Sequence, residues 1–298
     1  MFQKFVSLVA AAVTAACGFA AAPDKPAEAA SAPLKVLVIG NSFSASLMAH
    51  FPACAKAAGC PLDLVCATIS GSPLKLHAGN VSSSKKPYKV NWSYASLSDQ
   101  NAAPFAAGLE TKKGVRFGSL PELLKSDRWN VVTIQQQSMA SASADTFEPW
   151  AGQLIEAIRK LAPSAEIVLQ ETWAYNQNDG RYGKEPPVGK CPEEMFANLE
   201  RNYRELSARY GNLRIIHTGK AIQLFRERRK DKSAKNDCVS SGSDTKHLNE
   251  DGKYLQACVW LQSLFPKFDV TGLEYNGKSK HDFAKLARAC ARDAAVSR

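Results

Sequence analysis

The sequence lacks the patterns that several classes of protein need. It has no C-x-x-C pair and no histidine at ligand spacing from a cysteine, so we expect no zinc site. No other metal site is expected either. Its 38 lysine and arginine residues are scattered and form no basic stripe interleaved with aromatic residues, so the net charge of +10 does not indicate a nucleic-acid partner. No internal repeat is visible. What remains is a globular composition, 45% apolar and 22% charged.

The amino-terminal segment has the pattern of an export signal. Lys4 precedes an apolar run at 5–16, which suits a secretory signal peptide and is too short to span a bilayer stably. We expect 1–22 to be removed and 23–33 to form a disordered linker. The alternative is a lipid anchor at Cys17, because the sequence TAACG around it resembles a bacterial lipoprotein signal. Both interpretations predict an exported protein, periplasmic or extracellular.

The chain has eight cysteines, which suits an exported protein in an oxidising compartment. We therefore expect disulfides, although their connectivity does not follow from the sequence. The candidate pairs are Cys258 with Cys290, Cys191 with Cys238, and Cys54 with Cys60 or Cys66.

Apolar runs typical of buried strands alternate with helical patterns along the chain. This alternation predicts a parallel sheet covered by helices on both faces, a three-layer α/β/α domain over residues 34–298. We expect about five parallel strands. They lie at Leu34–Ile39, Leu62–Ile69, Trp129–Ile134, Glu166–Gln170 and Leu213–His217.

Regular patterning fades at about 77–118, which predicts an irregular insertion. The segment carries Trp92 and Tyr94 among serine, asparagine and glycine residues. Long insertions beside a ligand-binding edge often shape the substrate site. The two aromatic residues are therefore candidates for stacking on a sugar ring, and burial in a small hairpin is equally open.

The stretch at 34–44, LKVLVIGNSFS, places a serine where α/β proteins bind ligands. Its apolar part predicts a buried strand, and Gly40, Asn41 and Ser42 interrupt the run before a helical pattern begins. Ligands bind at the carboxyl ends of the strands in open α/β sheets, so Ser42 is a candidate nucleophile. The alternative is that Asn41 or Ser42 only caps the helix.

Three further loops at the same expected edge carry polar groups. Gly71 follows the second strand, where its N–H either points at a substrate or belongs to a plain turn. The third strand runs into the amides at 135–137. Asp244 lies three residues before His247 at the expected start of a late helix, within reach of the imidazole. Because a serine nucleophile needs a base and the base needs an orienting partner, Asp244 and His247 complete a candidate site with Ser42.

These blocks together resemble the SGNH, or GDSL-like, hydrolase superfamily. The resemblance spans about Leu34 to Leu264 and is closest to an uncharacterised bacterial branch. That branch has IGNSFS at the first strand, IQQQS at the third, ETWAY at the fourth and HLNEDGKYL near the end, all present here. The resemblance implies a flavodoxin-like fold and a serine esterase that needs no cofactor.

The resemblance also implies the roles of the site residues. Ser42 attacks an ester carbonyl, His247 acts as general base and then as general acid, and Asp244 orients His247. The backbone N–H groups of Ser42 and Gly71, together with a side-chain amide, hold the oxyanion.

Two departures from the superfamily affect the expected site. Asn41 stands where an aspartate is usual, and the third block has no Gly-x-Asn-Asp, so a glutamine must supply the amide. An alternating strand puts Gln135 and Gln137 on one side, with Gln137 nearer the carboxyl edge. We therefore expect Gln137, or else Gln135, to complete the oxyanion hole.

By analogy with the superfamily, we expect a secreted esterase that removes acetyl or other small acyl groups from a carbohydrate or a related small ester. The candidate substrate-binding residues are Asn41, Trp173, Trp92 and Tyr94, of which Trp173 either lines the pocket or covers it. One alternative is a lipase or thioesterase, although no long apolar loop suggests an acyl-chain tunnel. The other is a non-catalytic module that binds a glycan through the aromatic residues.

Overall fold

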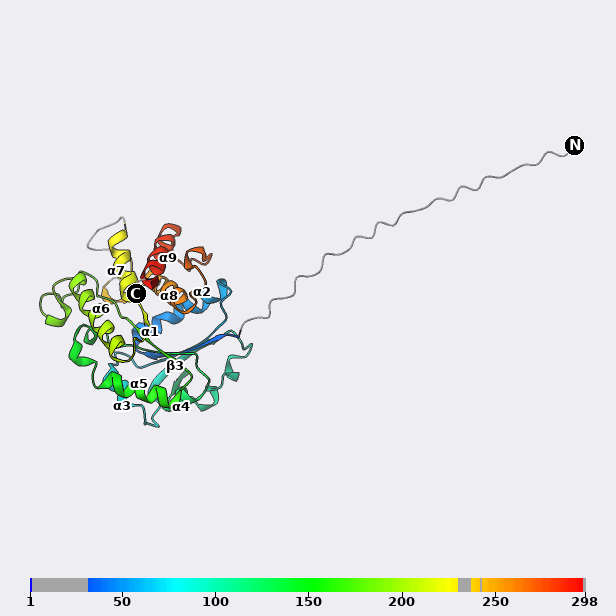
Figure 1. The fold of residues 1–298 in the computed structure, drawn as a ribbon, viewed down its shortest axis with the longest axis horizontal. Coiled ribbons are helices and arrows are strands. Elements are labelled where there is room, and N and C mark those ends of the chain that lie inside the picture. Colours follow the sequence, from blue (N-terminus) through cyan, green and yellow to red (C-terminus); the bar gives the residue numbers. More distant parts are fainter. Residues whose placement is uncertain (2–31, 230–236, 242, 297–298) are drawn as a thin grey trace. The chain divides into compact units, whose positions relative to one another are not determined.

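A parallel sheet lies at the centre of the fold, with helices on both of its faces (Figure 1). The computed structural model describes Met1 and residues 32–229, 237–241 and 243–296. The parallel strands run in the order β2-β1-β6-β7-β8, the flavodoxin-like arrangement, so the expected fold is confirmed. These strands are β1 (Leu34–Gly40), β2 (Leu62–Thr68), β6 (Val131–Ile134), β7 (Glu166–Gln170) and β8 (Ile215–Ile216).

The sheet is larger than expected, because the segment at 77–118 adds antiparallel strands to the edge at β2. β3 (Tyr88–Tyr94) pairs with β2, β5 (Val115–Gly118) pairs with β3, and β4 (Glu110–Lys112) pairs with β5. Among the described residues the sheet therefore has eight strands. The segment that the sequence predicted to be irregular is therefore partly regular, with three strands joined by irregular stretches.

The burial pattern of β3 explains this difference. Tyr88, Val90 and Tyr94 are buried on one face of the strand, whereas Lys89 is exposed. The apolar face extends the core beyond β2. The backbone of β3 also pairs with the N–H and C=O groups of β2 that a five-stranded sheet would leave unpaired at its edge. Polar residues between the aromatic ones obscured the pattern in the sequence.

Two groups of helices cover the sheet (Figure 1). One face carries α1 (Ser42–Ala45), the 3₁₀ helix η1 (Ser46–Ala49), α2 (Phe51–Ala57), α7 (Thr218–Arg228), α8 (Glu250–Leu264) and α9 (His281–Val296). The other carries α3 (Leu74–Gly79), α4 (Leu120–Lys125) and α5 (Trp150–Leu161). Helix α6 (Pro192–Arg209) contributes side chains to the cores on both faces.

The expected signal peptide at 1–22, its Cys17 and all but the last two residues of the expected linker at 23–33 lie outside the described residues, Met1 apart. Residues Ala32–Arg298 form one compact unit. Where the structure describes the chain, no helix is long and apolar enough to cross a membrane.

The structure does not bear out the expected disulfides, since none joins the described cysteines. Cys54 on α2 forms a hydrogen bond with Cys258 on α8, and Sγ of Cys66 lies 3.5 Å from the carbonyl oxygen of Ser44. Packing of the helices on the sheet therefore points these thiols at other partners. None of the expected pairs is joined in the structure, whether Cys258 with Cys290, Cys191 with Cys238, or Cys54 with Cys60 or Cys66.

Candidate active site

The candidate site lies between β1 and β6, where the order of the parallel strands reverses and α/β proteins bind ligands. Ser42 is the first residue of α1, directly after β1. A short ribbon of β9 (Ser240–Ser241) and β10 (Asp244–Leu248) carries Asp244 and His247. The sequence predicted the start of a helix here. The residues form a strand instead, and α8 begins only after it.

Ser42, His247 and Asp244 form a continuous hydrogen-bonded chain. Oγ of Ser42 lies 2.9 Å from Nε2 of His247, and Nδ1 of His247 lies 2.6 Å from Oδ2 of Asp244. An ionised carboxylate only accepts hydrogen bonds, so Nδ1 carries the hydrogen and Nε2 accepts from the serine hydroxyl. The side chains of His247 and Asp244 are 36% and 40% exposed, so the chain is open to solvent.

Backbone contacts help to keep Asp244 ionised. Its Oδ1 accepts hydrogen bonds from the N–H groups of Lys246 and His247, each at 3.2 Å. Burial acts to raise the pKa of Asp244, but the hydrogen bonds from His247 and from the two backbone groups outweigh it, and the pKa is lowered. Asp244 is therefore charged at neutral pH and can stabilise an imidazolium.

The backbone N–H groups of Ser42 and Gly71 donate to no acceptor in the described part of the protein. Gly71 has a φ of 64°, a conformation that favours glycine, although a Cβ there would meet no other atom. Nδ2 of Asn41 donates to the carbonyl oxygen of Ser72 at 3.1 Å, which holds the Gly71 turn beside the end of β1. These two N–H groups are the candidate oxyanion donors.

Neither glutamine is placed as the sequence predicted. Nε2 of Gln135 donates to Oδ1 of Asn41 at 2.8 Å and to the carbonyl oxygen of Gln136 at 3.3 Å, which uses both of its hydrogens. Oε1 of Gln137 accepts from the N–H of Ala140 at 2.9 Å, and its Nε2 donates to Oγ of Ser138 at 3.3 Å. The Gln135 amide thus holds the Asn41 side chain in place, and the Gln137 amide bonds only to neighbours in the turn at 137–140.

Three of the four expected substrate-binding side chains, Asn41, Trp173 and Tyr94, are buried. Tyr94 lies towards the opposite edge of the sheet and donates to Asp127 at 3.0 Å. Trp92 lies in the middle of β3 and is half-buried. Of the alternatives that the sequence left open for Trp173 and Tyr94, the structure shows burial, which places their large apolar surfaces in the core.

Trp173 supports both halves of the site. Its ring stacks on Phe43, the residue after Ser42, with the ring centroids 4.0 Å apart. Its Nε1 donates to the carbonyl oxygen of Lys246 at 2.9 Å, and the Phe43 ring meets that of His247 at 5.6 Å. One buried indole therefore links the segment of the nucleophile to the segment of the base.

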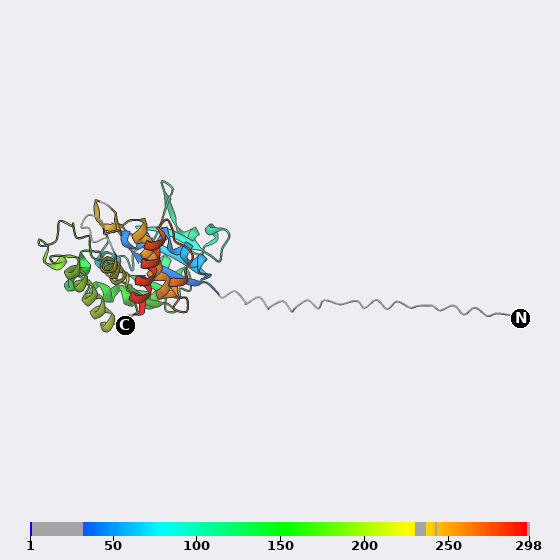
Figure 2. The same cartoon turned by 90° about the horizontal axis from the view of Figure 1, so that it is seen from above.

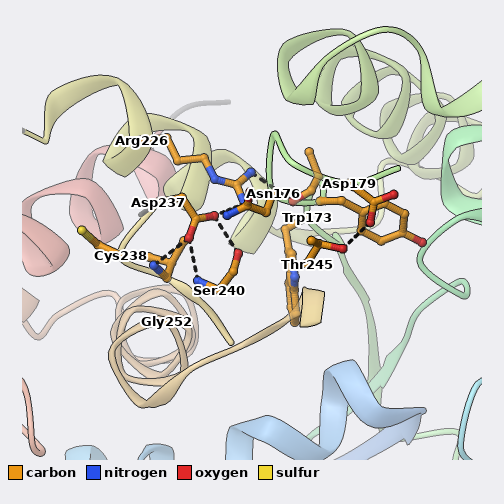
Figure 3. A network of polar contacts seen from close by, with 12 residues as sticks. Trp173, Asn176, Asp179, Arg226, Asp237, Cys238, Ser240, Thr245 and Gly252 are labelled. Atoms are coloured by element: carbon orange, nitrogen blue, oxygen red, sulfur yellow. Dashed lines mark hydrogen bonds and ion pairs between the residues drawn. The ribbon is translucent and has the colours of Figure 1, made fainter. Parts of the chain in front are cut away.

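Figure 3 shows further contacts that hold β10 and the residues before it. The hydroxyl of Thr245 donates to Asp179, and the carbonyl oxygen of Thr245 accepts from the N–H of Asn176 at 2.7 Å. Arg226 on α7 forms a buried ion pair with Asp237 at 2.9 Å. Burial acts to raise the pKa of Asp237, but Arg226 and hydrogen bonds outweigh it and the pKa is lowered. No local spacing relates these residues, so the sequence alone does not indicate them.

A second serine–histidine pair lies beside the Gly71 turn. Oγ of Ser72 is 2.9 Å from Nε2 of His77, and Nδ1 of His77 is 2.9 Å from the Tyr88 hydroxyl. Oγ of Ser72 donates to the carbonyl oxygen of Ile69 at 2.8 Å, so it accepts from Nε2–H, and Nδ1 accepts from Tyr88. Burial lowers the pKa of His77 to about 4. This imidazole therefore stays neutral and holds the turn.

The fold and the site define a three-layer α/β protein with the Ser-His-Asp arrangement of serine hydrolases. Within the described residues, no group of three or more histidine, cysteine, aspartate or glutamate side chains could hold a metal. The chain belongs to the DUF4886 family, a domain of unknown function, which matches residues 35–294.

Two solved structures illustrate the similarity. A DUF4886 family protein from Bacteroides uniformis is 23% identical and has a TM-score of 0.75. The alignment covers 89% of this chain and 96% of that protein's chain. A GDSL-like lipase from Bacteroides thetaiotaomicron is 13% identical and has a TM-score of 0.42. The alignment covers 78% of this chain and 89% of that protein's chain. No curated protein matches the sequence. The first of these structures supports the fold described above.

Proposed function

We propose that the protein is a serine hydrolase of carboxylic esters. Ser42 is its nucleophile, His247 its general base and Asp244 the residue that orients the base. The observation that carries this proposal is the hydrogen-bonded chain of the three side chains, open to solvent at the point where the sheet order reverses.

The geometry supports the following acylation step. Oγ of Ser42 attacks the carbonyl carbon of the ester while its proton moves to Nε2 of His247, and Asp244 stabilises the imidazolium. The carbonyl oxygen becomes an oxyanion next to the N–H groups of Ser42 and Gly71. Removal of one such donor costs about 3 kcal/mol of transition-state stabilisation in other enzymes. The C–O bond then breaks, the alkoxide takes the proton from Nε2, and an acyl-serine remains.

Hydrolysis of the acyl-serine follows the same path in reverse. A water molecule loses a proton to Nε2 of His247 as its oxygen attacks the acyl carbon. The bond to Oγ of Ser42 breaks, the proton passes from Nε2 to Oγ, and the carboxylic acid leaves. The enzyme returns to its starting state without a cofactor.

The substrate that we propose is a small acyl ester, such as an acetyl group, on a carbohydrate outside the cytoplasm. The exposed side chains of Asp244 and His247 suit a polar substrate that arrives from solvent. The signal pattern at the amino terminus supports export. A non-catalytic glycan-binding module has less support, because Trp173 and Tyr94 are buried. No observation favours a lipase or thioesterase.

Covalent labelling with a fluorophosphonate tests the proposal. We expect the probe to modify the wild-type protein at Ser42, as located by peptide mass spectrometry, and 4-nitrophenyl acetate to be hydrolysed. Ser42→Ala abolishes both signals. The matched control is Ser84→Ala at an exposed serine, which leaves both unchanged. A folded wild-type protein that takes no label while control esterases react would rule out the hydrolase.

A further inference from the structure

A groove separates β3 from the hairpin of β4 and β5. β3 pairs with β5 at two positions only, Tyr88 with Gly118 and Lys89 with Phe117, and the strands then diverge. The hairpin projects from the body of the fold (Figure 2). The groove has a volume of about 590 Å³. Pockets that hold small ligands have volumes of about 300 to 1,000 Å³.

The lining of this groove, which we call the β3–β5 groove, combines cationic and amide side chains with apolar ones. None of its lining residues is acidic. Its side chains include those of Met48, Lys89, Asn91, Trp92, Gln100 and Arg116. An excess of positive charge in a concave site attracts anions.

The two cations of the β3–β5 groove differ from their neighbours. Lys86 and Lys112 nearby each form an ion pair with a glutamate. Within the described residues, no carboxylate forms an ion pair with Lys89 or Arg116. The charges of Lys89 and Arg116 are therefore available to a ligand.

Contacts with uncharged groups hold Arg116 in place. Its Nη2 donates to Oδ1 of Asn101 at 2.7 Å, and its guanidinium lies 5.1 Å from the centroid of the Trp92 ring. Nε1 of Trp92 donates to the carbonyl oxygen of Gln100 at 2.9 Å, which fixes the ring. A cation that is already ordered loses little side-chain entropy when an anion binds.

The register of the sheet places the β3–β5 groove close to the candidate active site. Gly40 pairs with Thr68, and Thr68 pairs with Lys89, so the three residues lie in one row across the sheet. Two strand spacings separate Gly40 from Lys89 by about 10 Å, and Gly40 lies two residues before Ser42. Met48 reaches the groove from η1, which continues the helix that begins at Ser42.

We propose that the β3–β5 groove binds acidic residues of a carbohydrate chain whose ester group reaches Ser42. The cations Lys89 and Arg116 pair with the acidic groups, the amide of Asn91 suits hydroxyl groups, and Trp92 supplies an aromatic wall. The substrate is then an acylated, anionic carbohydrate. This inference rests on the proposed esterase function for the reaction but not for the binding.

Calorimetry on the Ser42→Ala variant tests the binding without turnover. The probes are a hexamer of galacturonate without ester groups and the same hexamer with its carboxyl groups reduced to alcohols. We expect the acidic hexamer to bind and the neutral one to bind at least tenfold more weakly. Adding Lys89→Gln and Arg116→Gln raises the Kd of the acidic hexamer at least tenfold.

Two further variants serve as controls. Lys85→Gln removes an exposed charge outside the groove and leaves the Kd unchanged. Arg116→Lys keeps the charge but loses the planar group that stacks on Trp92, so it raises the Kd less than Arg116→Gln does. A sulfated hexasaccharide that binds and depends on the same two cations would support the anion site with sulfate as the ligand. Equal binding of the acidic and neutral hexamers, no binding of either, or equally tight binding of oligothymidylate would overturn the proposal.

The outcome is independent of the hydrolase test. A protein that takes the fluorophosphonate label but binds no acidic hexamer keeps the esterase function and loses the anionic substrate. A protein that binds the hexamer through Lys89 and Arg116 but is never labelled at Ser42 keeps the β3–β5 groove and loses the esterase.

Discussion

Among the described residues, two serine–histidine pairs have the same separation of 2.9 Å between Oγ and Nε2. In the pair of Ser42 and His247, Asp244 accepts from Nδ1–H, so Nε2 is free to take the serine proton. In the pair of Ser72 and His77, the serine donates to a carbonyl oxygen, so Nε2 already carries a hydrogen. The two imidazoles therefore have opposite tautomers.

The two pairs also differ in their access to solvent. His77 is fully buried with the neutral hydroxyl of Tyr88 as its other partner, whereas His247 is 36% exposed with a carboxylate beside it. The buried pair has no group that would stabilise an imidazolium. A short contact between serine and histidine thus indicates a nucleophile only where the third partner and the exposure agree.

Alanine at each serine is expected to separate the pairs most strongly. Ser42→Ala lowers kcat on 4-nitrophenyl acetate by a factor of about 10⁴ or more, because the nucleophile is lost. Ser72→Ala retains covalent labelling at Ser42, since the serine beside the turn takes no part in bond formation. Kinetics and mass spectrometry check both variants. A label found on Ser72 would reverse the assignment of the two pairs.

Substitution of the third partner in each pair gives the next largest effect. Asp244→Asn favours the wrong tautomer of His247 and lowers kcat by about 10³, less than the roughly 10⁴ seen where such a carboxylate is buried. Tyr88→Phe leaves Nδ1 of His77 without its donor and costs about 1 to 2 kcal/mol of the free energy of unfolding. It changes kcat less than tenfold. Equal losses of kcat in the two variants would contradict the comparison.

The buried histidine is expected to make stability depend on pH. The pKa of His77 is about 4 in the folded protein, against an ordinary value of 6.5. The contribution of neutral His77 to the free energy of unfolding is therefore complete above pH 6.5 and is lost as the pH falls towards 4. In this range the unfolded chain takes up a proton that the folded protein does not. The shift corresponds to about 3 kcal/mol.

Urea unfolding of the wild type and of His77→Gln at pH 7 and pH 4 measures this contribution, because all other titrating groups are common to both proteins. The wild type should lose about 3 kcal/mol relative to the variant between the two pH values. A difference in unfolding free energy that does not change with pH would show that His77 titrates normally.

The smallest expected effect tests how the exposed pair is held. Trp173→Phe keeps the stacking on Phe43 and loses the hydrogen bond to Lys246, so kcat falls about three- to tenfold with KM unchanged, from about 1 kcal/mol of lost positioning. Trp260→Phe is the control, since this indole is buried and its Nε1 has no hydrogen-bond partner among the described residues. Equal kcat in the two variants would remove the positioning role of Trp173.

Local patterns were sufficient for the parallel sheet. The apolar run predicted at Glu166–Gln170 matches β7, and the one predicted at Trp129–Ile134 contains β6. Asp244 and His247 contact each other as their spacing predicted, although the backbone between them is extended rather than helical. Contacts between residues close in sequence survive such a change of conformation.

Patterns failed where a side chain has partners elsewhere in the chain. Gln135 was the second candidate, after Gln137, for the oxyanion hole, but its amide donates to Asn41, which lies 94 residues away. The segment at 88–94 became a buried strand because the edge of β2 needed a partner. For Trp173 the sequence left open whether it lines the pocket or covers it, and the structure buries it against Phe43.

The sequence by itself determined the alternation of strands and helices, and it placed Ser42 after the first strand and Asp244 three residues before His247. These features depend on residues that are near in the chain. Tertiary structure alone decided that Ser42 contacts His247, which lies 205 residues away. It also decided that Ser42, and not Ser72, faces an Nε2 without a hydrogen, and that Trp173 supports the site. Those outcomes depend on the packing of distant segments, and packing settles the tautomer, the exposure and the charge on which catalysis depends.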